Sequence, residues 1–267
     1  MRTGGITMIR MIASDLDGTL LEPVEHLPDG LFDTLEELDK LGITFVAASG
    51  RQYDNLRRLF APAARRMGFI CENGALNMLR GKEIKLQGIE REMGLAIIRR
   101  LMELPVCILV SGRHTCYVSP ENRAFTDDMV YRLRNTIAVV DRLDQIDDDI
   151  LKISAFAPDG VASFAPALER EWSHRLNAVV SGRCWFDFGT ASKETGIKAL
   201  METLSLAPDE VVAFGDQFND VTMLDAVGHP YLMENASQQL KTRGYRLCSK
   251  VLPVLRSIVE NRGELPL

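Results

Sequence analysis

The sequence lacks the features that mark membrane-spanning, secreted and nucleic-acid-binding proteins. No uncharged apolar stretch approaches the ~18 residues that cross a bilayer, and residues 1–7 contain no apolar signal-peptide core. The formal net charge is −6, so no basic excess favours a nucleic-acid backbone or an acidic membrane surface. We therefore expect a cytoplasmic protein that binds neither nucleic acid nor membranes. We expect it to be a monomer or a small homo-oligomer.

Cysteine and histidine are too scattered to suggest a metal centre. The five cysteines include no pair with C-x-x-C spacing, and their odd number argues against a disulfide framework. Each cysteine lies in or near an apolar run, where a small buried side chain is the simplest interpretation. The four histidines are dispersed, so surface or loop positions are expected for them. Together these features indicate a reducing compartment.

What the sequence does contain is an alternation of apolar runs and helical segments near both ends. The continuous apolar runs read as buried strands and lie at 9–13, 43–48, 69–71, 211–214 and 231–233. Amphipathic segments such as 27–41 and 193–204 lie between them and read as helices. Strands separated by helices in this way predict a parallel sheet with right-handed crossovers.

The middle of the chain follows a different pattern. Paired short strands are predicted at 76–79 with 83–86, 106–110 with 115–119, and 178–181 with 185–188. Helices are predicted at 91–104 and 161–174, and a further strand at 151–156. This arrangement favours an α+β layer on an antiparallel sheet. We therefore predict an α/β protein whose core, 1–77 and 189–267, is interrupted by an inserted domain at 78–188.

Acidic and polar residues stand where the predicted core strands end. Asp15 and Asp17 follow the first strand, Ser49 follows the second, and Asp216 follows the strand at 211–214. Open α/β sheets bind their ligands at this edge, and buried carboxylates need partners. Mg²⁺ prefers oxygen ligands and takes one or two carboxylates. We therefore expect Asp15 and Asp216 to share one Mg²⁺, with the Asp17 backbone carbonyl as a third ligand.

Four short motifs resemble those of the haloacid dehalogenase-like (HAD) phosphotransferases. They are Asp15-Leu16-Asp17-Gly18-Thr19, Ser49-Gly50, Lys193 at a predicted helix start, and Gly215-Asp216-Gln217-Phe218-Asn219-Asp220. The last of these, with Asn73-Gly74-Ala75, is typical of the Cof-type, sugar-phosphatase-like branch. The spacing between Gly189 and Lys193 is slightly looser than in the family. The resemblance covers about 9–77 and 189–262, and it implies a Rossmann-like parallel-sheet core with an inserted α+β cap domain.

The resemblance also implies a role for each residue. Asp15 would be the nucleophile that becomes phosphorylated, and Asp17 would be the general acid and base. Phosphate binding would fall to Ser49 and Gly50, and Lys193 would neutralise charge shared by nucleophile and phosphate. The residues with supporting roles would be Thr19, Arg51, Asn219 and Asp220.

Several local alternatives remain open from the sequence. Ser49 is also a suitable helix N-cap, and Arg51 could steady the substrate phosphate or be a surface residue. Lys198 competes with Lys193 for the lysine position, although Lys193 lies at the helix start. Asp220 would orient either a metal-bound water or Lys193.

The function that the resemblance implies is Mg²⁺-dependent hydrolysis of a small phosphorylated metabolite through an aspartyl-phosphate, with sugar phosphates as the family-level expectation. Specificity would then lie in the cap, 78–188, whose sequence matches no family pattern residue by residue. The nearest alternative is a phosphomutase similar to phosphomannomutase, which uses the same motifs. A second alternative is a non-catalytic protein that binds a phosphorylated ligand.

Overall fold

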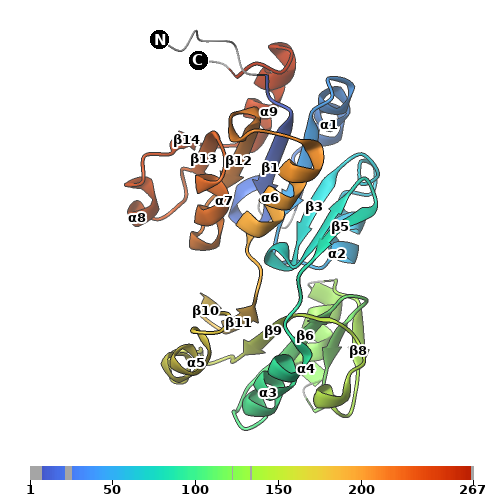
Figure 1. Cartoon of the computed structure of the whole chain (residues 1–267), viewed down its shortest axis with the longest axis vertical. Helices are drawn as coiled ribbons and strands as arrows, with labels where there is room; N and C mark the ends of the chain where they lie inside the picture. The colour runs from blue at the N-terminus through green and yellow to red at the C-terminus, as the bar shows by residue number, and fades with distance from the viewer. Residues whose placement is uncertain (1–7, 22–25, 122, 133, 266–267) are drawn as a thin grey trace. The chain divides into compact units, whose positions relative to one another are not determined.

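The computed structural model describes residues 8–21, 26–121, 123–132 and 134–265, and the statements below concern these residues. The segment 1–7, in which no signal peptide is predicted, lies outside them. The chain forms two compact units, each with its own sheet (Figure 1). The first comprises Met1–Arg51, Leu56–Lys85 and Ser192–Leu267, and the second comprises Gln52–Asn55 and Leu86–Ala191.

The first unit is built on an eight-stranded sheet. Its strands in spatial order are β14 (Arg246–Cys248), β13 (His229–Met233), β12 (Val211–Gly215), β1 (Met11–Asp15), β2 (Thr44–Ala48), β3 (Gly68–Cys71), β4 (Leu76–Leu79) and β5 (Lys82–Leu86). The strands from β14 to β3 are parallel, and β4 runs antiparallel to β3. β1, β2, β3 and β12 are buried throughout, as expected of strands covered on both faces. The predicted Rossmann-like α/β core is therefore confirmed.

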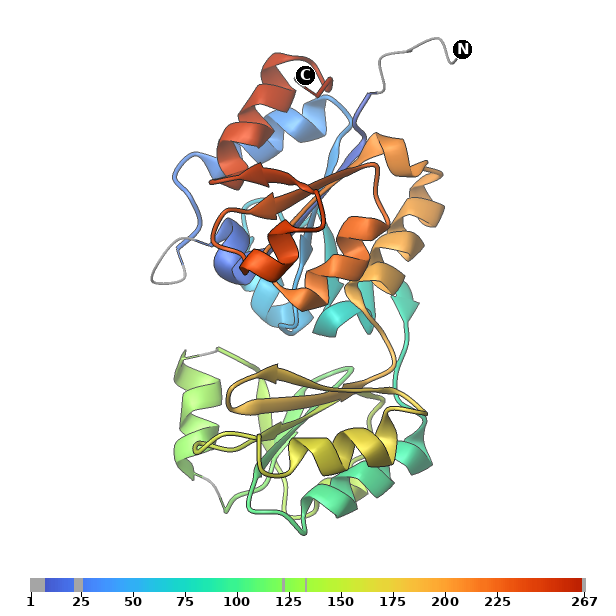
Figure 2. The ribbon, with the colours of Figure 1, turned by 90° about the vertical axis from the view of Figure 1, so that its left-hand side faces the viewer.

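Helices cover both faces of this sheet (Figure 2). On one face, α6 (Lys193–Leu204) and α7 (Val221–Asp225) pack against Met11 and Ala13 of β1. On the other, α1 (Leu31–Lys40) and α9 (Val251–Glu260) lie side by side. The remaining helices of this unit are α2 (Tyr53–Leu59), which begins within the segment grouped with the second unit, and α8 (Gln238–Lys241).

The second unit has a six-stranded sheet. Its spatial order is β10 (Asn177–Gly182), β11 (Trp185–Gly189), β9 (Ile150–Phe156), β6 (Cys107–Gly112), β7 (Cys116–Val118) and β8 (Ile137–Val139). Two of the predicted hairpins are confirmed as the antiparallel pairs β6–β7 and β10–β11. β8 pairs parallel with β7, and the sequence did not predict it.

The helices of the second unit are α3 (Arg91–Leu101), α4 (Arg123–Asp127) and α5 (Ala165–Trp172). α3 and α5 pack on β9 and β11 through a cluster that includes Ile98, Leu168, Phe186 and Phe188. Phe125 of α4 packs in a separate cluster with Leu109 of β6. No helix in the described part of the chain is long and apolar enough to cross a bilayer.

The boundary between the two units differs from the predicted one. The sequence places it at 77/78 and 188/189, whereas the contacts divide the chain after Lys85 and before Ser192. The reason is the β4–β5 hairpin. Because β4 pairs with β3, this hairpin extends the larger sheet instead of starting the inserted domain.

Candidate active site

Three neighbouring strand ends bring the predicted site residues together. β1 lies between β12 and β2, and all three run parallel, so their carboxyl ends meet at one edge of the sheet. Asp15 is the last residue of β1. Asp216 directly follows β12, and Ser49 directly follows β2. Asp15, Ser49 and Asp216 are all buried, with 6%, 2% and 3% of their surface exposed.

A buried lysine joins two of the carboxylates. Lys193 Nζ donates hydrogen bonds to Asp15 Oδ1 at 2.5 Å and to Asp220 Oδ1 at 2.6 Å, and the residue is 1% exposed. Its position follows from the helix start, because the Ser192 hydroxyl caps α6 by accepting from Thr195 N. Lys198, the competing candidate, is exposed on the same helix and pairs with Glu194.

The cluster contains three carboxyl groups and one ammonium group. Asp15, Asp216 and Asp220 can each place a carboxylate oxygen within 4.8 Å of the others. Burial raises the pKa of Asp15 to about 7, although the Lys193 ammonium opposes this shift. Burial alone would lower the pKa of Lys193, but Asp15 and Asp220 outweigh it and the pKa is raised. Burial also raises the pKa of Asp216. One ammonium therefore faces three carboxylates.

Asp216 is held on both of its oxygens. Thr19 Oγ1 donates to Oδ1 at 3.1 Å, and Gln217 Nε2 donates to Oδ2 at 3.0 Å. Gly18 packs directly against this carboxylate, where any Cβ would overlap Asp216 Oδ2. The glycine also has a φ of +87°, so other residues would be strained there for two reasons. The loop after β13 contributes Asn235, whose Nδ2 donates to the Gly18 carbonyl at 2.8 Å.

Asp220 differs from the other two acids because its hydrogen bonds fix the local backbone. Its Oδ2 accepts from the backbone N–H groups of Asp216 and Gln217, both at 3.0 Å, while its Oδ1 accepts from Lys193. Both oxygens of Asp220 are thus engaged in holding the loop and the lysine. Asp216 is contacted by the side chains of Thr19 and Gln217, whereas Asp220 anchors backbone N–H groups of its own loop.

The Asp17 side chain is largely exposed and pairs with Arg51. Arg51 Nε and Nη2 donate to its two oxygens at 3.1 and 2.5 Å, and the side chains are 58% exposed for Asp17 and 16% for Arg51. Within the same loop, Ser49 Oγ accepts from Arg51 N at 3.2 Å. Gly50 lies between them. The Arg51–Asp17 pair is a contact that neither sequence interpretation of Arg51 included.

Not every residue of the motifs joins the cluster. Asn219 is exposed, and its side chain forms no hydrogen bond with the described residues. Conversely, sequence reasoning missed Gln217 and Asn235. The sequence position of Asn235 could have indicated its role. It is one of the first polar residues after the apolar run of β13, at the same sheet edge as Asp216.

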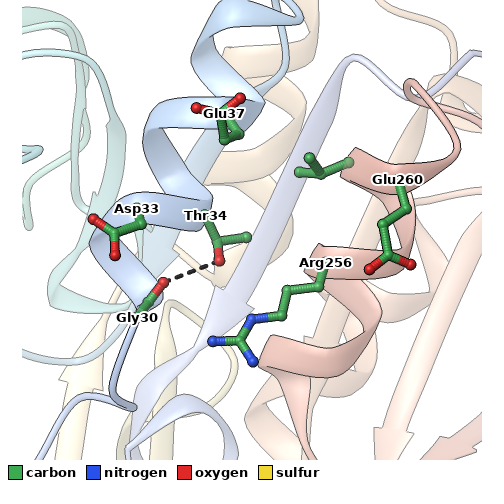
Figure 3. Close-up of a pocket in the computed structure, with 7 residues that line it drawn as sticks. Gly30, Asp33, Thr34, Glu37, Arg256 and Glu260 are labelled. Carbon is green, nitrogen blue, oxygen red and sulfur yellow. Dashed lines mark hydrogen bonds between the residues drawn. The ribbon is translucent and has the colours of Figure 1, made fainter.

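A separate hollow lies between α1 and α9 (Figure 3). Its lining residues are Gly30, Asp33, Thr34, Glu37, Arg256, Val259 and Glu260. They include side chains of both charges and none of the predicted site residues. The carboxylate cluster at the ends of β1 and β12 therefore remains the candidate active site.

Comparison with known proteins identifies the family of the chain. The profile of the haloacid dehalogenase-like hydrolases matches residues 12–250. The 5-amino-6-(5-phospho-D-ribitylamino)uracil phosphatase YbjI of Escherichia coli (strain K12) is 26% identical, covering 96% of this chain and 98% of that protein. A solved structure from Eubacterium rectale is 27% identical, with a TM-score of 0.86 over 94% of this chain and 99% of that one.

A more distant structure agrees in fold. The subclass IIB sugar phosphatase BT4131 is 19% identical, with a TM-score of 0.78, covering 94% of this chain and 98% of that chain. At this identity the likeness shows the fold alone. The family resemblance predicted from the motifs is confirmed by the profile match, and the chain belongs to the haloacid dehalogenase-like hydrolases.

Proposed function

We propose that this protein is a Mg²⁺-dependent phosphatase that hydrolyses small phosphorylated metabolites, with sugar phosphates as the expected class, through an aspartyl-phosphate on Asp15. The observation that carries the proposal is the buried Lys193, joined to Asp15 and Asp220 beside Asp216 at the end of the central strands. The names of the relatives support it, since YbjI is a phosphatase of a phosphorylated ribityl compound and BT4131 a sugar phosphatase.

The proposed chemistry assigns covalent catalysis to Asp15. Its carboxylate oxygen attacks phosphorus, the ester P–O bond breaks, and an acyl phosphate forms on Asp15. Asp17 gives a proton to the departing alkoxide and then takes one from the water that hydrolyses the acyl phosphate. Lys193 holds the attacking carboxylate and balances the negative charge that nucleophile and phosphoryl group share. Ser49 and Gly50 bind the phosphoryl oxygens.

The residues fit a bound Mg²⁺. Asp15 and Asp216 would hold the ion with the Asp17 backbone carbonyl, while Thr19 and Gln217 orient Asp216. The ion would supply positive charge that offsets repulsion between the carboxylates and the phosphoryl group. The excess of carboxylates over ammonium groups in the cluster supports this assignment.

The second unit is proposed to read the part of the substrate beyond the phosphate. It corresponds to the predicted cap, and the carboxylate cluster is formed by the first unit alone. We also propose that the enzyme acts in the cytoplasm, where thiols stay reduced, because its five cysteines are dispersed and odd in number.

The test is a panel of phosphate monoesters assayed with Mg²⁺, with phosphate release as the readout. The wild-type protein should hydrolyse at least one sugar phosphate, and Asp15→Asn should hydrolyse none, because an amide is a poor nucleophile. Asp33→Asn, an exposed substitution on α1, is the matched control and should retain wild-type rates. Full activity of Asp15→Asn, or no turnover of any ester by the wild type, would refute the proposal.

A further inference from the structure

The turn that follows β3 has an unusual backbone. Glu72, Asn73 and Gly74 have successive φ values of +48°, +54° and +101°. Left-handed conformations are uncommon for residues other than glycine, and a side chain such as that of Glu72 gains nothing from one. Strain of this kind persists only where the surrounding structure over-determines it, and it is concentrated at functional sites.

Backbone contacts fasten this turn to the candidate phosphate-binding loop. Asn73 N donates to the Ser49 carbonyl at 3.0 Å, and Glu72 N donates to the Arg51 carbonyl at 3.1 Å. The two hydrogen bonds flank Gly50 on both sides. The strained turn therefore fixes the backbone of the loop that is proposed to bind the phosphoryl oxygens.

The same turn also packs against the start of α6. A Cβ on Gly74 would overlap the carbonyl group of Ser192, the residue that caps the helix and directly precedes Lys193. The turn thus lies between two elements of the candidate site, the loop after β2 and the helix that presents the lysine. This double contact explains why the chain accepts the strain.

The Asn73 side chain lies directly on Gly50. A Cβ built on Gly50 would be 3.3 Å from Asn73 Oδ1 and 3.4 Å from Nδ2, so the amide occupies the space beside the glycine. Asn73 Oδ1 is buried and has no hydrogen-bond partner among the described residues. Buried polar atoms usually find partners, so the hydrogen bonds of the fold do not account for this amide.

We propose that Asn73 is a positioning residue for the phosphoryl group, and this inference rests on the proposed function of the same site. Its left-handed backbone donates to the Ser49 carbonyl, beside the bond from Glu72 N to the Arg51 carbonyl, and its side chain packs against Gly50 with a neutral group. Asparagine, aspartate and glycine all tolerate this backbone conformation. A carboxylate at this position would place a negative charge beside Gly50 and repel an anion bound there, whereas the neutral amide does not.

The test compares Asn73→Asp with Asn73→Gly. Asn73→Asp keeps the shape of the side chain and adds one negative charge, whereas Asn73→Gly relaxes the backbone and removes the amide. Asn261→Asp makes the same charge change at the C-terminal end of α9, near the opposite edge of the sheet, and serves as the control. The readouts are the Kd of inorganic phosphate by calorimetry with Mg²⁺, kcat and KM for the best ester, and far-ultraviolet circular dichroism.

Asn73→Asp should raise both the phosphate Kd and KM by roughly tenfold or more, as expected for a like charge in a partly buried site. Asn73→Gly should raise them several-fold, and Asn261→Asp should leave them unchanged. A phosphate Kd for Asn73→Asp within twofold of the wild-type value would overturn the inference. If Asn73→Asp does not fold, Asn73→Gly provides the test. A phosphate Kd for Asn73→Gly within twofold of the wild-type value would then overturn the inference.

Failure of this inference is distinguishable from failure of the proposed function. If Asp15→Asn abolishes hydrolysis while Asn73→Asp leaves the phosphate Kd unchanged, the phosphatase proposal is supported and the proposed role of Asn73 is refuted. If the wild type hydrolyses no ester but Asn73→Asp still weakens phosphate binding, the role of Asn73 is supported and the phosphatase proposal is refuted. A wild-type protein that binds no inorganic phosphate would overturn the role of Asn73.

Discussion

Replacing Lys193 with methionine tests the electrostatics of the cluster. Lys193 is 1% exposed and is the one side-chain donor that the described part of the chain offers to the Asp15 carboxylate. Methionine fills a similar volume but removes the charge, which leaves Asp15 and Asp220 without their shared cation. Breaking a buried ion pair in this way costs about 3–5 kcal/mol. We therefore expect Lys193→Met to lower the free energy of unfolding of the first unit by that amount without Mg²⁺.

The loss should depend on pH in a defined direction. Burial has already raised the pKa of Asp15 from 3.8 to about 7, and removing the opposing lysine should raise it further. A carboxyl group whose folded pKa exceeds its unfolded value loses its stabilising contribution as the pH rises through the folded pKa. The deficit of Lys193→Met relative to wild type should therefore be smaller near pH 5 than above pH 8.

The measurement must report on the first unit. Tryptophan fluorescence would not, because Trp172 and Trp185 both lie in the second unit. Native-state hydrogen exchange of the β1 and β12 amides, at several pH values, measures the required stability. Lys198→Met is the matched control, since Lys198 is an exposed partner of Glu194 on the same helix and exposed pairs contribute at most about 1 kcal/mol. Equal stability of the two variants, or a deficit that grows as the pH falls, would refute the reasoning.

Three further predictions concern metal, proton transfer and specificity. Mg²⁺ at 100 times its Kd should stabilise the first unit by about 2.7 kcal/mol, and excess chelator should remove both this gain and hydrolysis, whereas full activity in chelator would contradict the metal assignment. Asp17→Asn should slow capture from a sugar phosphate by ~10²–10⁴ but affect a nitrophenyl ester much less, with phosphoenzyme accumulating; equal slowing of both esters in single-turnover assays would remove the acid role. Replacing residues 86–191 by a short linker should retain weak hydrolysis of a small activated ester and abolish discrimination among sugar phosphates, provided that the product is first shown to fold. Unchanged relative rates across the esters would place specificity in the first unit.

The residues at the strand ends could be predicted because their signals are local. A continuous apolar run marks a strand buried on both faces, and the first acid after it marks the sheet edge where ligands bind. Asp15 and Asp216 satisfy both conditions, and the structure places them at neighbouring strand ends. The start of α6 is also a local signal, and Ser192 caps it. This position at the helix start distinguishes Lys193 from Lys198.

Other features depend on contacts between distant segments and could not be predicted. The hairpin formed by β4 and β5 is visible in the sequence, but the sheet that it joins is decided by the pairing of β4 with β3. β8 has only three residues, and its parallel pairing with β7 has no turn signal. The ion pair between Asp17 and Arg51 joins residues 34 positions apart, so the sequence left the role of Arg51 open.

Net charge and local charge lead to different conclusions about the ligand of this protein. A chain with a net charge of −6 has no general attraction for a phosphorylated metabolite. The cluster at the ends of β1 and β12 adds three carboxylates and one buried ammonium at the place where that metabolite would bind. Binding of an anion at such a site is favoured by added positive charge, which the proposed Mg²⁺ would supply, and by the absence of a further carboxylate beside Gly50. A neutral amide at Asn73, where the backbone would equally accept aspartate, meets the second condition.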